Sequence, residues 1–344
     1  MKPQVKPSAS GVYSPSMDKE IASGEPSVEM DQHWMQRAID LSRKGEGHVE
    51  PNPMVGCVLT RDNVVIGEGY HAAFGGPHAE VVALRSCDNP LGATAYVTLE
   101  PCCHHGKTPP CADALIAAGV ARVVIATGDP FPRVSGGGIK LLRDAGVTVE
   151  IGTLASEAES VLAPFLKRVV TGLPWVIAKW AMSIDGRIAT RFGESQWITG
   201  PEARADVHRV RGRVDTIITG MGTVASDDPL LTARPPGPRV ATRAIVCRNR
   251  LPDPSAKLIL TAAEVETVIA VPPSLAGQAT RVLGETSARV QTIEEAPLIT
   301  GLLRQLGSHE ATNVVLECGS ELMASFFEQN LIDEFHVYIG RKAI

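Results

Sequence analysis

The chain has 344 residues, of which 33 are Lys or Arg and 38 are Asp or Glu, so its formal net charge is -5. This length accommodates two domains of ordinary size. The composition, 44% hydrophobic and 21% charged, is typical of a soluble globular protein. The acidic balance disfavours a nucleic-acid partner, because general nucleic-acid binders carry a basic excess. No apolar run reaches the roughly 18–20 residues that a transmembrane helix needs, so we expect no membrane partner.

Residues 1–30 are rich in Pro, Ser and Gly and poor in large apolar side chains, which predicts a flexible tail. They contain no apolar segment of the kind that a secretory signal requires. The seven cysteines are an odd number. We therefore expect a cytoplasmic protein, in which clustered cysteines bind metal or carry out chemistry rather than form structural disulfides.

From Asp31 the sequence alternates between helical and strand patterns. A helix that stops at Gly45 precedes two strands joined by a turn at 61–63. A further helix follows His78, and a helix with proline just inside its start ends at Gly119. This pattern predicts an α/β domain over 31–152 with a largely parallel sheet, whose sites collect at the carboxyl ends of strands. A connecting helix is predicted over 153–173, and a second α/β pattern over 174–344.

Three residues are predicted to bind a metal ion: His78, Cys102 and Cys111. One nitrogen and two sulfur ligands suit Zn²⁺. Three protein ligands leave a fourth position for water, whereas a structural site normally fills all four. Glu80, two residues after the histidine, is the predicted catalytic proton carrier. It would take a proton from the zinc-bound water, whose pKa the metal lowers to roughly 7, and deliver it to a leaving amine.

The order of these residues matches the pattern of zinc nucleobase deaminases, H-x-E followed by P-C-x-x-C. The chain contains H-A-E and then Pro101–Cys102, but the segment "CHHGKTPP" separates the two cysteines in place of two residues. Cys103 is expected to point away from the metal as a bystander. A structural zinc site and a redox-active cysteine pair remain the alternative interpretations.

The segment "EPCCHHGKTPPC", together with "PNPMVGCV", "GGPHAEVVAL" and "DPFPRVSGGG", resembles the deaminase half of the bifunctional riboflavin-biosynthesis deaminase/reductase family. The segments "KWAMSIDGRIA", "GESQWITG" and "GTVASDDPLLTAR" resemble the reductase half of the same family. The resemblance extends from about Asp31 to the end of the chain. It implies a cytidine-deaminase-like α/β/α domain followed by a dihydrofolate-reductase-like α/β domain.

The resemblance implies two consecutive reactions. The first half would hydrolyse an amine from 2,5-diamino-6-(5-phosphoribosylamino)pyrimidin-4(3H)-one with Zn²⁺ as cofactor. The second half would use NADPH to reduce the ribosyl group of the product to a ribityl group. The partner is then a small-molecule phosphoribosylaminopyrimidine, and the family suggests a homo-oligomer, either a dimer or a tetramer.

Site residues can be carried over where the motifs match. In the deaminase half the substrate contacts are Asn52, His71, His104 and Lys107. Lys107 suits the substrate phosphate, while Asn52 could equally be a turn residue and His104 could simply shape its loop.

In the reductase half, Lys179 is the predicted catalytic residue, because a lysine in an apolar strand is unusual unless it serves a site or a salt bridge. The predicted NADPH contacts are Ala181, Trp197, Thr223, Asp227 and Gly319. The predicted contacts to the phosphorylated substrate are Ser195, Arg211, Leu231, Arg234 and Glu317.

The second half departs from the family pattern at three places. Cys318 stands where the family usually has glycine, and its side chain is expected to crowd the backbone that approaches a phosphate. Cys247 and Arg248 replace Asp-Ser, and the chain ends at "YIGRKAI", before the expected Gly-Gly loop and further strands. We therefore expect the reductase half to be short at its C-terminal end, whether natively or by truncation.

Three alternatives follow: an impaired reductase, a zinc deaminase of another free base, nucleotide or tRNA, and a non-catalytic zinc protein. Glu80 discriminates against the last of these, because a structural site needs no carboxylate there.

Overall fold

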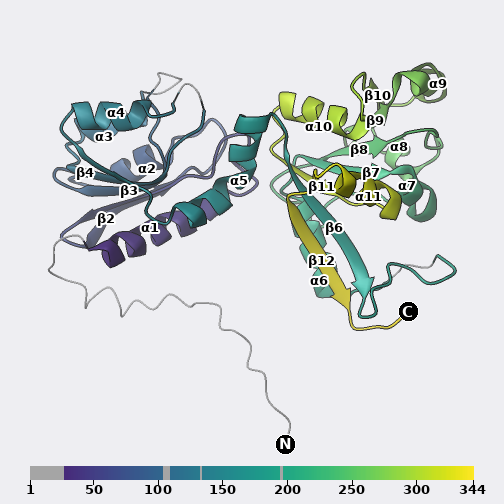
Figure 1. Ribbon diagram of the computed structural model, residues 1–344, viewed down its shortest axis with the longest axis horizontal. Helices are drawn as coiled ribbons and strands as arrows, with labels where there is room; N and C mark the ends of the chain where they lie inside the picture. The colour runs from purple at the N-terminus through teal and green to yellow at the C-terminus, as the bar shows by residue number, and fades with distance from the viewer. Residues whose placement is uncertain (1–26, 104–108, 132–133, 194–196) are drawn as a thin grey trace, which may run out of the picture.

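The structure is a computed structural model that describes residues 27–103, 109–131, 134–193 and 197–344. It contains two α/β bodies, joined by helix α5 (Ala155–Thr171) (Figure 1). Most of the predicted tail lies outside the described residues. Helix α1 (Val28–Ser42) begins ahead of the predicted start because Ser27 caps it, its Oγ accepting a hydrogen bond of 3.2 Å from the Met30 N–H.

The first body is built on a five-stranded sheet in the order β2-β1-β3-β4-β5. Strand β1 pairs antiparallel with both β2 and β3, whereas β3, β4 and β5 run parallel. The prediction of a largely parallel sheet was therefore wrong for this half. The antiparallel pairing of β1 with β2 arises from the hairpin that joins them, whose turn residues Asp62 and Asn63 have φ values of 51° and 58°. The strands are β1 (Gly56–Arg61), β2 (Val64–Tyr70), β3 (Thr94–Leu99), β4 (Arg122–Thr127) and β5 (Thr148–Ile151).

Helices cover both faces of this sheet, because its strands alternate buried side chains between the two faces. Cys57 and Leu59 of β1 pack in one cluster with α2 (Ala79–Arg85), α3 (Cys111–Ala117) and α4 (Gly137–Asp144). Val58, between them in sequence, packs on the opposite face with α1 and the first part of α5. The result is the predicted α/β/α arrangement. A short 3-10 turn (Arg43–Gly45) follows α1.

The second body is built on a seven-stranded sheet in the order β10-β9-β8-β7-β11-β6-β12, in which every pairing is parallel. Parallel strands need crossover connections, and helices supply most of them. The strands are β6 (Trp175–Ser183), β7 (Thr216–Gly220), β8 (Thr242–Val246), β9 (Thr267–Val271), β10 (Arg289–Thr292), β11 (Asn313–Leu316) and β12 (Glu334–Gly340). The helices are α6 (Pro201–Arg211), α7 (Met221–Asp227), α8 (Lys257–Leu260), α9 (Pro273–Leu283), α10 (Leu298–Ser308) and α11 (Ser320–Glu328).

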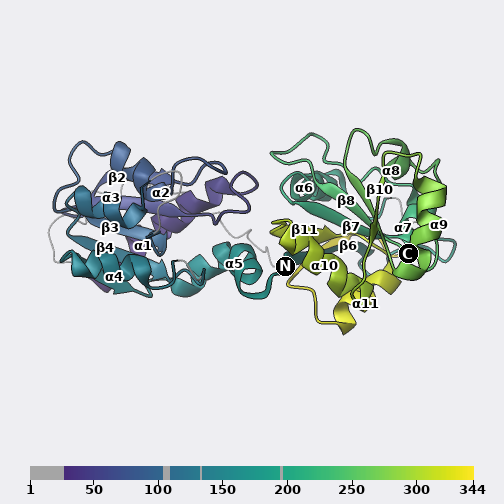
Figure 2. The ribbon, with the colours of Figure 1, turned by 90° about the horizontal axis from the view of Figure 1, so that it is seen from above.

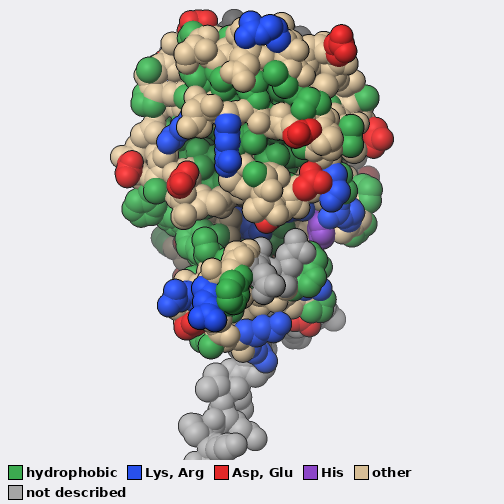
Figure 3. All heavy atoms as spheres, turned by 90° about the vertical axis from the view of Figure 1, so that its right-hand side faces the viewer, with side chains coloured by type: hydrophobic (Ala, Val, Ile, Leu, Met, Phe, Trp, Pro, Cys, Tyr) green, Lys and Arg blue, Asp and Glu red, His purple; other side chains and the backbone are tan. Residues whose placement is uncertain are grey.

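The surface of the second body carries charges of both signs. Viewed from its free side, acidic and basic side chains lie interspersed with hydrophobic ones (Figure 3). None of the helices among the described residues has the length and apolarity needed to cross a bilayer.

The two bodies meet where the end of α5 approaches α10 (Figure 2). Gly172 ends α5 with φ 72°, and a Cβ added to Gly307 of α10 would lie 1.9 Å from the Gly172 carbonyl oxygen. Ion pairs cross the same joint: Lys167 Nζ lies 2.5 Å from Asp333 Oδ2, and Arg213 pairs with Glu46. The joint is thus a backbone-to-backbone contact flanked by charges.

This contact predicts an asymmetry between two glycine-to-alanine substitutions in helices of the second body. Gly307→Ala should lower the free energy of unfolding by about 1–3 kcal/mol, because the new methyl group cannot fit against Gly172. A Cβ added at Gly277 of α9 would have Arg281 Nη1, 3.9 Å away, as its nearest neighbour. Gly277→Ala should therefore be neutral or stabilising. Calorimetric melting of the two variants measures the difference, and equal melting temperatures would contradict the close contact.

Candidate active sites

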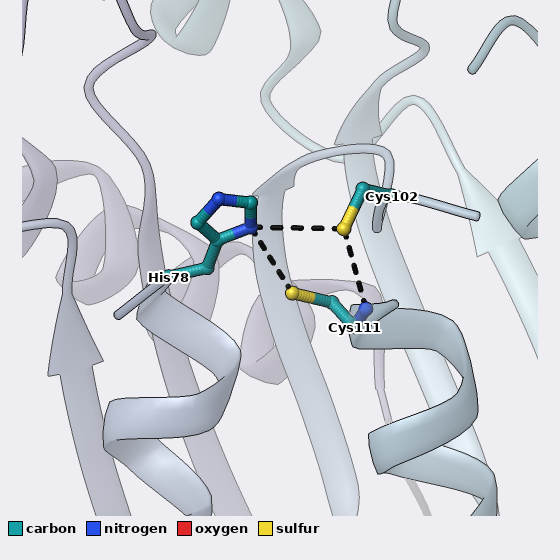
Figure 4. A group of neighbouring side chains, drawn as sticks. All are labelled: His78, Cys102 and Cys111. Atoms are coloured by element: carbon teal, nitrogen blue, oxygen red, sulfur yellow. Dashed lines mark hydrogen bonds between the residues drawn. The ribbon is translucent and has the colours of Figure 1, made fainter. Parts of the chain in front are cut away.

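The three predicted metal ligands come together at the carboxyl end of the first sheet (Figure 4). His78 Nδ1 lies 3.6 Å from Cys102 Sγ and 3.3 Å from Cys111 Sγ. Tetrahedral zinc, with bonds of about 2.3 Å to sulfur and about 2.1 Å to nitrogen, holds such atoms about 3.6 Å apart. The donor set therefore fits zinc. Cys103 is not part of this group, and its Sγ lies 3.8 Å from the Val134 carbonyl oxygen.

Local structure fixes each ligand. His78 occupies the position just before α2, Cys102 follows β3, and Cys111 is the first residue of α3. Proline was predicted just inside the start of α3, but Pro110 instead occupies the capping position. The backbone N–H of Cys111 has no partner within the helix and donates to Cys102 Sγ over 3.3 Å.

Hydrogen bonding shifts the pKa values of the three ligands in different directions. The hydrogen bond from the Cys111 thiol is the main cause that lowers the pKa of Cys102, against the effect of burial. The resulting thiolate is the form that binds metals. The same hydrogen bond raises the pKa of Cys111, while the hydrogen bond to Cys102 raises the pKa of His78.

Glu80 lies in the first turn of α2, beside the metal ligands, and is 3% exposed. Burial raises the pKa of its carboxyl group above the ordinary value, and the side chain hydrogen-bonds to Cys111. A carboxyl group with a raised pKa suits a proton carrier that must both accept and release a proton near neutral pH.

The metal group opens into a cavity of about 500 Å³ that Asn52 and His71 also line. His71 Nδ1 donates to the Pro77 carbonyl oxygen over 3.0 Å, so Nε2 accepts from Asn52 Nδ2 over 3.2 Å. Burial lowers the pKa of His71, which favours this neutral form. Asn52 Oδ1 makes no hydrogen bond to the described residues. The predicted contacts His104 and Lys107 lie outside the described residues.

Glu100 also lines this cavity, and no role was predicted for it. Its buried carboxylate accepts hydrogen bonds from the backbone N–H groups of Gly136 (3.0 Å), Gly138 (2.9 Å) and Ile139 (3.2 Å). It thereby ties the start of α4 to the loop that carries Cys102. An acidic residue directly before the Pro-Cys motif was the available sequence signal.

The second body has a cavity of about 570 Å³ at the carboxyl ends of its central strands. Lys179 on β6 lines it. Every other predicted reductase residue in the described part of the chain lines it too: Ala181, Trp197, Arg211, Thr223, Asp227, Leu231, Arg234, Glu317 and Gly319. Ser195 lies outside the described residues.

Glu317 organises the charges of this cavity. Its buried carboxylate accepts hydrogen bonds from Arg211 Nε (2.6 Å) and Nη2 (2.9 Å) and from Lys179 Nζ (3.2 Å). Burial disfavours the carboxylate, but Lys179 and Arg211 lower the pKa of Glu317 to about 2. Lys179 therefore both forms a salt bridge and lines the cavity. The salt-bridge and active-site interpretations of this lysine are thus compatible.

A smaller cavity of the second body, of about 310 Å³, adjoins the 570 Å³ cavity, and Gly222 and Gly319 line both. Arg248 and Arg250 line the second cavity, and guanidinium groups suit phosphate. A Cβ added at either glycine would meet no atom within 4 Å, so a phosphate can approach the backbone there. These features fit a dinucleotide. Cys318 lines the larger cavity but also packs against a hydrophobic core, and burial raises the pKa of its thiol to about 12.

Comparisons with known proteins agree with both halves. Residues 28–127 match the cytidine and deoxycytidylate deaminase zinc-binding region, and residues 174–344 match the RibD C-terminal domain. The riboflavin biosynthesis protein RibD of Actinobacillus pleuropneumoniae is 42% identical over 318 residues, which covers 91% of this chain and 84% of that protein. RibD of Escherichia coli is 42% identical over 325 residues, covering 91% and 88%.

The chain belongs to the RibD family.

Solved structures of RibD proteins share its architecture. RibD of Acinetobacter baumannii superposes with a TM-score of 0.80 at 39% identity, covering 92% of this chain and 88% of that one. A diaminohydroxyphosphoribosylaminopyrimidine deaminase/5-amino-6-(5-phosphoribosylamino)uracil reductase from Thermotoga maritima gives 0.79 at 33% identity, with the same coverage. The chain is thus a bifunctional riboflavin biosynthesis enzyme, a zinc-dependent deaminase joined to an NADPH-dependent reductase. Neither the family matches nor these structures support an isolated deaminase or a non-catalytic zinc protein.

The position of Glu80 predicts the behaviour of its amide variant. Glu80→Gln should lower the rate of ammonia release by about 10²–10⁴-fold, the usual contribution of general acid–base catalysis. Zinc content should stay at the wild-type level because the three ligands are intact. Glu157→Gln, an exposed glutamate on α5, is the matched control. Undiminished ammonia release from zinc-loaded Glu80→Gln would refute the assigned role.

Proposed function

We propose that this enzyme deaminates 2,5-diamino-6-(5-phosphoribosylamino)pyrimidin-4(3H)-one and then reduces the ribosyl group of the product to ribityl. The observation that carries the proposal is the buried Glu80 beside a His-Cys-Cys group, on the same chain as a second cavity that fits a dinucleotide. The substrate class is that of the Thermotoga maritima relative, a diaminohydroxyphosphoribosylaminopyrimidine deaminase, which supports the proposal.

In the deaminase site, His78, Cys102 and Cys111 would hold zinc, which would make a hydroxide nucleophile available at neutral pH. Glu80 accepts the proton of the attacking water and passes it to the departing amine, which leaves as ammonia. The ring lies against Asn52, whose Oδ1 accepts from a substrate N–H group, and against His71. We assign His104 to substrate contact and Lys107 to the substrate phosphate.

In the reductase site, bound NADPH would supply the hydride that C1′ of the ribosyl group gains as the bond from C1′ to the ring oxygen breaks. Lys179, whose Nζ lies 3.2 Å from the Glu317 carboxylate, provides the proton that this oxygen gains. Glu317 also fixes Arg211, which with Arg234 binds the negatively charged substrate. Leu231 and Ser195 complete the substrate contacts. The cofactor contacts are Ala181, Trp197, Thr223, Asp227 and Gly319, and we add Arg248 and Arg250 for its phosphates.

We place this chemistry in the cytoplasm. All seven cysteines are free thiols, among them the two metal ligands. A reducing compartment keeps such thiols available for a metal. This supports a cytoplasmic location.

A coupled reaction tests the two proposed steps together. The zinc-loaded enzyme, given the diaminopyrimidine substrate and NADPH, should release ammonia and consume NADPH in equal amounts. Glu80→Gln should stop both processes, and addition of the deaminated product should restore NADPH consumption. Loss of NADPH absorbance and ammonia release are followed in the same sample. NADPH consumption by Glu80→Gln without added product would sink the proposed order of steps.

We further propose that the enzyme is a homodimer that pairs through strand β12. Phe335, Val337 and Ile339 point to one face of this edge strand and are 48%, 38% and 55% exposed. Phe327 of α11, also exposed, lies beside them, with 6.1 Å between its ring centroid and that of Phe335. An exposed apolar patch of this kind is typical of a protein interface.

Charge placed in this patch should separate the subunits. We expect Phe335→Glu to sediment as a monomer, because a carboxylate cannot be buried in an apolar interface without a partner. Phe74→Glu, at a phenylalanine 59% exposed in the first body, should keep the wild-type mass. Analytical ultracentrifugation distinguishes the two species. A monomeric wild-type enzyme would contradict the proposal.

A further inference from the structure

The deaminase cavity is not built by the first body alone. Helix α5, which connects the two bodies, contributes Phe165, Arg168 and Val169 to its wall. Gly172 at the end of this helix and Gly307 from the second body complete the wall. The connecting helix is therefore part of the substrate site, and Arg168 is the one Lys or Arg among the described lining residues.

Arg168 has few partners for a partly buried cation. Its Nη2 donates to the Pro51 carbonyl oxygen over 3.2 Å, and its Nε is buried without a hydrogen-bond partner. No carboxylate of the described residues forms an ion pair with it. A guanidinium group stays charged at any physiological pH. Arg168 is therefore a partly buried charge without a counter-ion, and such a charge destabilises the free protein.

Three other arginines that are withdrawn from solvent, Arg211, Arg239 and Arg243, do not share this deficit. Arg211 pairs with Glu317, and Arg239 Nη2 lies 2.6 Å from Asp215 Oδ1. Arg243 has no carboxylate either, but oxygens satisfy its guanidinium, including the carbonyls of Leu258 and Val265. Arg168 differs from them in that it both has no carboxylate partner and makes a single hydrogen bond.

We propose that Arg168 binds the phosphate group of the deaminase substrate. This inference rests on the proposed function, which supplies a substrate with a phosphate at one end and a pyrimidine at the other. Guanidinium groups bind phosphate through paired hydrogen bonds. The hydrogen bond to Pro51 places Arg168 beside Asn52, the predicted ring contact. One wall of the cavity thus carries groups for both ends of the substrate, and Arg168 acts in addition to Lys107.

The test compares two substrates that differ only in the phosphate. Ammonia release is measured with the phosphorylated diaminopyrimidine and with the same compound after phosphatase treatment. Arg168→Gln should lower kcat/KM for the phosphorylated compound roughly 10- to 100-fold, the scale of a lost hydrogen bond to a charged group. The loss should fall on KM. For the dephosphorylated compound, the variant and the wild type should agree within about twofold.

A matched control separates phosphate binding from support of the backbone. Arg143 Nη2 also donates to a backbone carbonyl, that of Val149, over 3.3 Å, but it lies on α4, outside the cavity lining. Arg143→Gln should leave both substrates unaffected. Arg168→Lys keeps the charge without the paired donors, so it should show a smaller loss, again with the phosphorylated compound alone. Reductase turnover of the deaminated product shows which variants are folded, and Arg168→Lys carries the test if Arg168→Gln is not.

The outcomes distinguish this inference from the function on which it rests. Equal losses for both compounds would show that Arg168 only supports the Pro51 loop, and would overturn the inference. No loss for either compound would overturn it as well. If the wild-type enzyme releases ammonia from neither compound, the proposed substrate itself is wrong. A loss confined to the phosphorylated compound supports phosphate binding by Arg168.

Discussion

A buried carboxylate directly after a parallel strand organises each half of this enzyme. Glu100 follows β3, Glu317 follows β11, and they are 4% and 7% exposed. Removing a carboxylate from water costs several kcal/mol unless hydrogen bonds or cations compensate for it. Glu100 is compensated by backbone N–H groups, which fix the loops around the metal ligands. Glu317 is compensated by Lys179 and Arg211, which hold the charged groups of the reductase cavity.

Sheet topology determines which residues these carboxylates can reach. In a parallel sheet the carboxyl ends of all strands lie at one edge, so residues far apart in the chain become neighbours. Lys179 and Glu317 are 138 positions apart, yet they meet because β6 and β11 are adjacent. The metal ligands are closer in sequence, His78 and Cys111 being 33 positions apart. The sequence signal of the metal site is therefore confined to a short part of the chain, whereas that of the reductase site is spread over much of the second half.

This difference explains how much of the protein the sequence predicted. The metal group and Glu80 were predicted because their chemistry lies in two short segments with recognisable spacing. Glu100 and Arg168 were missed, because an acidic residue after a strand or an arginine on a helix acquires meaning only from its tertiary neighbours. The antiparallel pairing of β1 was missed although its hairpin turn was predicted. Helices α6 and α9 were also missed, although each has proline at its first position, a recognised signal of a helix start.

The contact between Gly172 and Gly307 bears on why two enzymes share one chain. Covalent fusion is often understood as a way to raise the local concentration of one module near another. Here the second body also supplies part of the wall of the first cavity, next to the end of α5. A deaminase half released from its partner would lose that wall and open its substrate cavity to water. The fusion therefore completes an active site, and the junction between the two enzymes is itself a functional part of the first.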